Sequence, residues 1–324
     1  MTKISRAKFL RKTSQLAAGT CLLGFAACSQ KDGKSDSQKT VMQEPVLEAE
    51  HEVLFKDNVG LQLYTLREQL SKDRKATLTR VAEIGFKQIE LYDTATMQET
   101  ASIIKDLGMT PAATHIPSGY VTDKWAADSK PAAGDNFEKL LEACAANGIF
   151  NAGVAFLAPE ERTSLSDYHR FSELANKAGE KAKSMGVQFY YHNHSFEFEP
   201  MNGTTPFEVL TGALDPQLVK LELDIFWIAV SGNDPISWIN KLGDQVLAIH
   251  IKDLKEGVPQ DFKLQVPNDA FKPVGQGILD MRSILKAAHE AGVKYGFVEQ
   301  DQHGQTDPFD NLKASYQKLQ ELGL

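Results

Sequence analysis

Ionisable residues alternate with aliphatic ones in several short stretches of the sequence. Glu222 and Asp224 alternate with leucines, His250 and Lys252 alternate with isoleucines, and Glu299 ends a similar run. A β-strand points successive side chains to opposite faces, so the ionisable residues of each stretch share one face. Carboxylates and neutral imidazoles bind divalent cations such as Mn, Mg, Co or Zn. We therefore predict one divalent metal ion bound by Asp224, His250 and Glu299.

The stretch Tyr191-His192-Asn193-His194 adds two imidazoles on one face of another predicted strand. A single inward histidine is more often a hydrogen-bonded core residue, but because His192 and His194 share a face, we expect at least one of them in the site. Histidine can move protons near neutral pH. Lys252 is another inward ionisable residue and a candidate for the site. The alternative for Lys252 is that its stem is buried and its charged end reaches solvent.

Eight short apolar stretches are expected to form strands, and longer helical patterns separate them. The stretches are 59–64, 87–91, 110–115, 149–156, 187–192, 219–224, 246–251 and 295–299. Alternating strands and helices predict a parallel sheet. Eight such units within residues 53–324 fit a single-domain (β/α)8 TIM barrel. The competing open sheet would carry a glycine-rich dinucleotide motif after its first strand, and residues 63–67 contain no glycine.

The predicted barrel explains why the ionisable residues point to a site. They lie near the C-terminal ends of their strands, where barrel enzymes keep their active sites. Burying carboxylates without partners costs several kcal/mol each. A cation shared by these carboxylates would offset that cost. This favours a metal site over a set of polar core residues with only a structural role.

Residues 1–27 have the features of a lipoprotein-type signal peptide. Basic residues precede an apolar stretch at 16–27, and small residues precede Cys28. The apolar stretch is shorter than the roughly 20 residues that span a bilayer. We expect cleavage before Cys28 and lipidation of that cysteine, with plain secretion or a retained anchor as alternatives. Residues 28–52 are rich in Ser, Gln, Lys, Asp and Glu and are the expected flexible tether.

Charge and cysteine content limit the possible partners. Removing residues 1–27 takes away five basic residues and no acidic one, so the net charge changes from −8 to −13. Such a charge argues against a nucleic-acid partner, which requires a basic surface. With Cys28 lipidated, Cys144 has no partner for a disulfide. We expect an exported, periplasmic or cell-surface protein that meets the membrane only through its lipid. The sequence leaves a homo-oligomer open.

Several motifs together resemble the xylose isomerase-like TIM barrels known as sugar phosphate isomerases/epimerases. That group also includes tagatose epimerases, inosose dehydratase and endonuclease IV. The resemblance covers roughly residues 58–324. The motifs are Gly60-Leu61-Gln62-Leu63-Tyr64-Thr65-Leu66-Arg67, Phe86-Lys87-Gln88-Ile89-Glu90-Leu91, Tyr191-His192-Asn193-His194, Glu222-Leu223-Asp224, His250-Ile251-Lys252-Asp253, Val274-Gly275-Gln276-Gly277 and Val298-Glu299-Gln300-Asp301.

The resemblance implies roles for individual residues. The family's epimerases hold one divalent metal with a Glu, an Asp, a His and a second Glu, which correspond here to His192, Asp224, His250 and Glu299. His192 thus departs from the family's Glu, and Trp227 stands where the family often has a substrate-binding His. Because the two glutamates act as opposed acid and base, two-base epimerisation does not follow from the resemblance. The candidate substrate-binding residues are Tyr64, Glu90, His115, Trp227 and Asp301.

The resemblance implies a metal-dependent sugar isomerase or epimerase that acts through an enediolate. The metal would act as a Lewis acid on a carbonyl and its neighbouring hydroxyl. A base would take the adjacent proton, with Glu299 as the first candidate, followed by His192 and His194. Lys252 is the remaining candidate catalytic residue. Export implies a non-phosphorylated sugar or keto-sugar. One alternative is a lyase or hydratase acting on a 3-keto-sugar or its glycoside, because the same enediolate can lose a β-oxygen. Another is a non-catalytic sugar-binding lipoprotein.

A long segment, 253–277, follows the predicted strand of His250. Its prolines exclude a regular helix, and its apolar residues are able to pack. We expect this segment to fold over the barrel mouth as a lid that shapes sugar specificity, with a decorative surface loop as the alternative. The turn Gly275-Gln276-Gly277 either cradles a phosphate or simply leads into the next helix.

Overall fold

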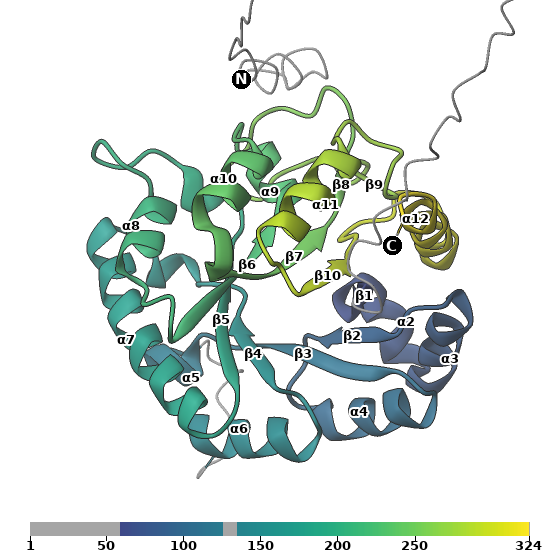
Figure 1. Ribbon diagram of the computed structural model, residues 1–324, viewed down its shortest axis with the longest axis horizontal. Helices are drawn as coiled ribbons and strands as arrows, with labels where there is room; N and C mark the ends of the chain where they lie inside the picture. Colours follow the sequence, from purple (N-terminus) through teal and green to yellow (C-terminus); the bar gives the residue numbers. More distant parts are fainter. Residues whose placement is uncertain (1–58, 126–134, 324) are drawn as a thin grey trace, which may run out of the picture.

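The computed structural model describes residues 59–125 and 135–323. The predicted signal peptide, the tether and Cys28 lie outside these residues. Eight parallel strands close into a barrel in the order β1-β10-β7-β6-β5-β4-β3-β2, and helices cover its outside (Figure 1). The prediction of a (β/α)8 TIM barrel is confirmed. None of the described helices is long and apolar enough to cross a membrane.

The bounds of the elements follow the predicted alternation of strands and helices. The barrel strands are β1 (Val59–Gln62), β2 (Gln88–Leu91), β3 (Thr110–Ile116), β4 (Asn151–Val154), β5 (Gln188–His192), β6 (Val219–Asp224), β7 (Val246–Ile251) and β10 (Tyr295–Val298). The helices are α2 (Arg67–Lys72), α3 (Arg74–Ile84), α4 (Met97–Asp106), α5 (Gly119–Thr122), α6 (Phe137–Ala146), α7 (Leu165–Ser184), α8 (Pro206–Ala213), α9 (Ile225–Val230), α10 (Pro235–Leu242), α11 (Met281–Glu290) and α12 (Pro308–Glu321).

Local hydrogen bonds account for where the elements begin and end. The first strand was expected to reach Tyr64 but ends at Gln62, because the Gln62 side chain accepts the backbone N–H of Tyr64 (3.0 Å). A short 3-10 helix, η1 (Leu63–Leu66), starts there. Helix α7 begins at Leu165, since Ser164 and Asp167 form a capping box before the predicted apolar pattern.

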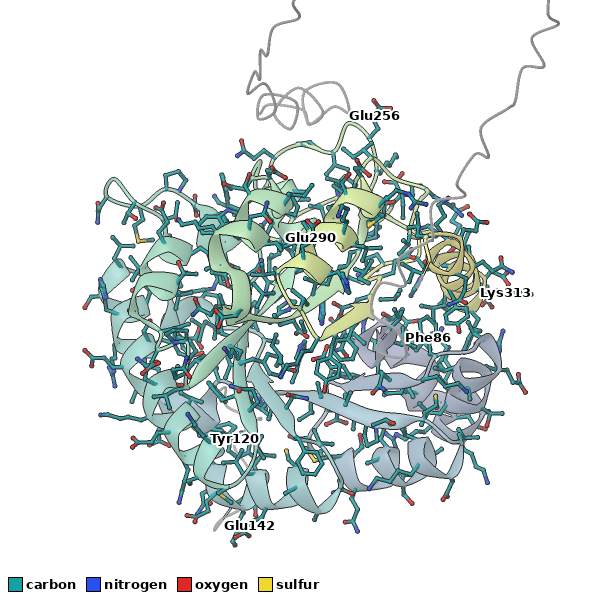
Figure 2. All side chains as sticks on the ribbon, in the orientation of Figure 1. Phe86, Tyr120, Glu142, Glu256, Glu290 and Lys313 are labelled. Carbon is teal, nitrogen blue, oxygen red and sulfur yellow. The ribbon has the colours of Figure 1, made fainter. Side chains whose placement is uncertain are left out.

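Apolar side chains pack in two places. The larger cluster lies between the strands and the surrounding helices. A smaller one fills the barrel interior below the mouth and consists of Ala112, Ala113, Tyr190, Leu247, Ala248 and Phe297. Gly153 makes room for Tyr190, because a Cβ at Gly153 would lie 2.2 Å from the Tyr190 ring. In Figure 2, side chains crowd the space between the strands and helices, whereas Glu256 points away from the molecule.

The segment after β7 forms structure of its own. Two short strands, β8 (Asp253–Leu254) and β9 (Phe271–Lys272), pair in an antiparallel manner and form a separate two-stranded sheet. Phe271 stacks on Phe226 of α9, with ring centroids 4.2 Å apart. The segment is thus anchored at both ends beside the barrel mouth.

Candidate metal and catalytic site

A cavity of about 930 Å³ opens at the C-terminal ends of the strands. Most of the predicted site residues line it, namely Tyr64, His115, His192, His194, Trp227, Lys252, Glu299 and Asp301. The other three, Glu90, Asp224 and His250, are fully buried and do not line it. The barrel therefore brings the predicted residues together, in one layer at the cavity and one layer beneath it.

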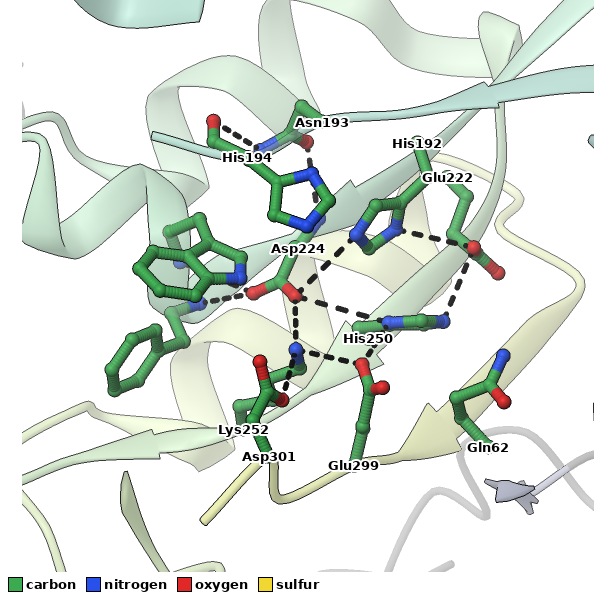
Figure 3. Close-up of polar contacts among 12 residues, drawn as sticks. Gln62, His192, Asn193, His194, Glu222, Asp224, His250, Lys252, Glu299 and Asp301 are labelled. Carbon is green, nitrogen blue, oxygen red and sulfur yellow. Dashed lines mark hydrogen bonds and ion pairs between the residues drawn. The ribbon is translucent and has the colours of Figure 1, made fainter. Parts of the chain in front are cut away.

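Asp224, His250 and Glu299 converge at the cavity floor (Figure 3). The Glu299 carboxylate lies 2.7 Å from Nδ1 of His250, and Oδ2 of Asp224 lies 3.8 Å from the same nitrogen. One ligand atom from each residue lies within 4.8 Å of the others. His192 is adjacent, with Nε2 3.7 Å from Oδ2 of Asp224. This donor set of carboxylates and imidazoles fits a divalent metal ion.

Asp224 has two tasks, one for each carboxylate oxygen. Its Oδ1 accepts the backbone N–H groups of Phe226 (3.0 Å) and Trp227 (3.1 Å) and so caps helix α9. Its Oδ2 faces the other site residues. Because the cap fixes the carboxylate, the second oxygen is held in place for a ligand.

Two buried glutamates hold the histidines from below. Oε2 of Glu222 lies 2.8 Å from His115 Nε2, 3.1 Å from His250 Nε2 and 3.2 Å from His192 Nδ1. Glu90 lies 2.7 Å from His250 Nε2. Both His192 and His250 thus turn one nitrogen to the predicted metal position and the other to a carboxylate. This pairing is typical of metal-binding histidines, because the carboxylate fixes the ring's tautomer and orientation.

His115, His192, Glu222 and His250 also form a group with ligand atoms within 4.8 Å of one another. In that group, three imidazole nitrogens lie around a single oxygen of Glu222 at hydrogen-bond distances. We therefore interpret Glu222 as a negatively charged support that holds the three imidazoles from below.

Irregular strand pairing places the two glutamates. The register between β2 and β3 shifts at Ile89/Glu90, and that between β6 and β7 shifts at Leu221/Glu222. Such irregularities redirect side chains and are common at barrel rims and near active sites. Glu90 also accepts hydrogen bonds from Gln62 Nε2 (2.7 Å) and the Tyr190 hydroxyl. The buried carboxylate is therefore held by three strands besides its own.

Burial and neighbouring charges together set the protonation states of Glu299 and His192. Burial alone would raise the pKa of Glu299, but Lys252 and His250 hold that pKa well below its ordinary value. Burial also lowers the pKa of His192, to about 4, and the nearby His250 adds to this. At neutral pH, Glu299 is therefore ionised and His192 is a neutral imidazole, which are the forms that bind a metal ion.

Lys252 does not reach solvent, contrary to the alternative considered above. Its side chain is 2% exposed, and its Nζ lies 2.8 Å from Asp224 Oδ2. The same Nζ lies 2.7 Å from Glu299 Oε2 and 2.7 Å from Asp301 Oδ1. Burial alone would lower the pKa of Lys252, but the three carboxylates raise it well above its ordinary value. The ammonium is thus a charged part of the site.

Aromatic rings form the upper wall of the cavity. The ring centroids of Trp227 and His194 lie 5.8 Å apart, and Phe156 and Phe271 also line the cavity. Within the described residues, Trp227 Nε1 and His194 Nδ1 have no hydrogen-bond partner although both are buried. Unpaired polar atoms beside aromatic faces suit a ligand that carries both hydroxyl groups and apolar C–H faces.

The Gly275-Gln276-Gly277 turn is already occupied by a side chain of the protein. Asp253 accepts the backbone N–H groups of Gly275 (2.8 Å) and Gly277 (2.9 Å). A Cβ at Gly277 would lie 2.2 Å from the same carboxylate. The N–H groups that a phosphate would need are therefore engaged, and the turn serves to connect the lid to helix α11.

The predicted lid segment reaches the cavity. Leu264, Val266, Asn268 and Phe271 are among the lining residues. Leu264 adopts a left-handed backbone conformation with φ of 57°, which is costly for a side chain of this type. The segment is therefore part of the cavity wall.

Glu222 was predicted to face inward but was not predicted to be a site residue. Gln62 and Tyr190, which donate hydrogen bonds to Glu90, were not predicted to be site residues either. Their positions on the inward face of their strands were the available signal. The spacing could not indicate which carboxylates face the cavity and which support the histidines.

The chain is similar to known proteins in sequence and in fold. The family model described as "Xylose isomerase-like TIM barrel" matches residues 78–322. An inosose dehydratase of Lacticaseibacillus casei is 28% identical over 158 residues, which are 46% of this chain and 52% of that protein. The chain therefore aligns with about half the length of this curated relative.

Solved structures share the fold. A sugar phosphate isomerase/epimerase from Parabacteroides distasonis ATCC 8503 superposes with a TM-score of 0.64 at 23% identity, over 82% of this chain and 94% of that one. An IolI protein with a bound zinc atom superposes with a TM-score of 0.59 at 16% identity, over 82% and 98% of the two chains.

Proposed function

Because the chain belongs to the family of xylose isomerase-like TIM barrels, we propose that it is a metal-dependent sugar isomerase or epimerase. The observation that carries this proposal is the convergence of Asp224, His250 and Glu299 at the floor of the cavity. Asp224, His250, Glu299 and His192 would hold the metal. When bound, the metal would supply Lewis-acid polarisation of a substrate carbonyl and its neighbouring hydroxyl.

The protein's own residues supply the rest of the chemistry. Glu299 is ionised and faces the cavity, so it can accept the proton next to the carbonyl. The neutral His194 also faces the cavity and can hold a proton on another side of the substrate. Trp227 offers its aromatic face and its unpaired N–H to the sugar. We further propose that the lid residues restrict which sugar fits.

The charges of the cavity support a substrate without phosphate. Its described lining contains four acidic residues and two lysines, and one of these lysines, Lys252, is bound to three carboxylates. The glycine turn that could have bound a phosphate is engaged by Asp253. We therefore propose a free keto-sugar, ketose or glycoside as the substrate.

A lyase or hydratase is the second candidate, and a specific observation favours it. Epimerisation needs two opposed bases. Among the four proposed metal ligands, Glu299 is the one glutamate, because His192 stands where the family has its other Glu. Similarity to an inosose dehydratase points in the same direction. In that reaction, loss of a β-oxygen would follow removal of the proton.

Product analysis tests both candidates. The metal-loaded protein is incubated with ketoses, 3-keto-sugars and their glycosides, with phosphorylated counterparts as controls, and the products are identified by NMR. We expect turnover of the unphosphorylated compounds. An epimer or aldose product supports the first candidate, and an unsaturated or dehydrated product supports the second. Binding without turnover of any compound would contradict both and favour a sugar-binding protein.

Export is a separate proposal. We propose that the mature chain is a lipoprotein anchored through Cys28, on the basis of residues 1–28. Labelling of expressing bacteria with a radioactive fatty acid, and the loss of the label in Cys28→Ser, would test it. Labelling that persists in Cys28→Ser would contradict it.

A further inference from the structure

Lys252 occupies the position between the candidate metal ligands. Its Nζ contacts Oδ2 of Asp224 and Oε2 of Glu299, and these are the oxygens that turn towards His250. The ammonium is buried, so solvent does not screen its charge. A divalent ion bound to the same two oxygens would meet this positive charge directly. The ammonium and the metal therefore compete for one pair of carboxylates.

A third carboxylate, that of Asp301, is an alternative ion-pair partner for the Lys252 ammonium. Asp301 Oδ1 lies 2.7 Å from Nζ, but Asp301 is outside the group of candidate ligands. Asp301 is also nearer to solvent, with a side chain that is 19% exposed. Nζ lies 5.9 Å from the centre of the Trp227 ring, a face that attracts cations. The flexible lysine stem allows a shift towards Asp301 without a change of backbone.

We propose that Lys252 is a displaceable internal cation of the metal site. Without metal, its ammonium pairs with both Asp224 and Glu299 and offsets one of their two negative charges. When a divalent ion binds, the two charges of the metal offset these two carboxylates, and Lys252 forms a separate ion pair with Asp301. Buried charges remain paired in both states, which avoids the cost of an isolated buried charge. This inference rests on the metal site of the proposed function and assigns a role to Lys252 and Asp301 in metal uptake.

The test measures metal affinity in a cycle of variants. The metal-free full-length protein is titrated with Mn²⁺ and with Zn²⁺ against a chromophoric chelator. We expect Lys252→Met to bind metal about tenfold more tightly or better, because the competing cation is gone. Asp301→Asn should bind metal more weakly, because the displaced ammonium has lost its alternative partner. In the double variant, Asp301→Asn should have no further effect, since Asp301 acts only through Lys252.

Controls separate this role from general effects of charge and folding. Lys255→Met removes a lysine three positions away that pairs with Asp269 on the surface, and it should leave metal affinity unchanged. If Lys252→Met is unstable without metal, Lys252→Gln removes the charge but keeps a hydrogen-bond donor. The melting temperature of either variant should rise more on metal addition than that of the wild type.

The outcomes are distinct from those that test the proposed function. Wild type and Lys252→Met with equal metal affinity would overturn the inference. Additive effects of Lys252→Met and Asp301→Asn on metal affinity would also overturn it, because they would indicate that each charge acts on the metal ion separately. A protein that binds metal with the predicted cycle but turns over no sugar would support the inference and contradict the proposed activity.

Discussion

Glu222→Gln tests whether the buried lower layer builds the metal site. In the wild type, one oxygen of Glu222 lies 3.1 Å from His250 Nε2 and 3.2 Å from His192 Nδ1. The glutamine keeps the shape of the side chain but removes the negative charge that orients both rings. His250 retains Glu90 at 2.7 Å, whereas His192 loses its carboxylate partner on that nitrogen. Both candidate ligands should therefore be held less firmly.

The expected loss of metal affinity in Glu222→Gln depends on how many candidate ligands Glu222 supports. Loss of an outer-shell partner typically lowers metal affinity about 10–100-fold. This corresponds to roughly 1.4–2.8 kcal/mol of binding free energy, at about 1.4 kcal/mol for each factor of ten. We expect an effect in this range for Glu222→Gln, because one ligand loses its support and the other keeps part of it.

Metal affinity is measured by competition with a chromophoric chelator. The matched control is Glu197→Gln, which replaces another fully buried glutamate. Glu197 accepts hydrogen bonds from the Tyr191 hydroxyl (2.7 Å) and the His194 backbone N–H (2.9 Å) but contacts no candidate ligand ring. Its metal affinity should equal that of the wild type. A folded Glu222→Gln protein with unchanged affinity would refute the two-layer arrangement.

Three further predictions concern stability and the lid. Burial raises the pKa of Glu197 from an ordinary 4.5 to about 7, so the stability it contributes below pH 4.5 is lost as the pH rises through 7. The free energy of unfolding, measured with urea, should fall by about 3 kcal/mol for the wild type relative to Glu197→Gln between pH 4.5 and 8. A difference between the two proteins that does not change with pH would contradict this. Gly153→Ala should destabilise the fold by about 1–3 kcal/mol because its Cβ meets the Tyr190 ring; Gly212→Ala, with open space around it, is the control, and equal stabilities would refute the packing argument. Replacing residues 256–270 with a short Gly-Ser link should raise KM for the sugar while metal content is unchanged, and an unaltered KM would show that the lid does not shape the substrate site.

The alternation of residue types predicted the barrel and several of the ionisable residues that line its mouth. In the C-terminal halves of β6 and β7, Leu221, Leu223, Ile249 and Ile251 belong to the larger apolar cluster. Glu222, Asp224 and His250 alternate with them and face the site, as the period of two requires. The end of β1 could not be predicted in this way, because it depends on a hydrogen bond from the Gln62 side chain. Tyr64 therefore lies on a turn at the cavity and is 39% exposed.

Depth within the barrel was the information that the sequence lacked. Glu90 and Asp301 are both inward carboxylates, yet Glu90 is buried among Gln62, Tyr190 and His250 whereas Asp301 lines the cavity. Glu90 lies within β2 at a register shift that no residue pattern marks, whereas Asp301 follows the end of β10. The same holds for Lys252, whose position between three carboxylates depends on strands distant in the chain.

The central claim is that this site removes a proton next to a sugar carbonyl, a step that isomerase, epimerase and lyase reactions share. The most direct measurement is deuterium incorporation from D₂O into a keto-sugar, followed by proton NMR with the metal-loaded protein. We predict exchange at the carbon next to the carbonyl, and a rate at least about 100-fold lower in Glu299→Gln, as is typical for loss of an acid–base group. Exchange no faster than with metal ions in buffer, or equal exchange by Glu299→Gln, would contradict the account.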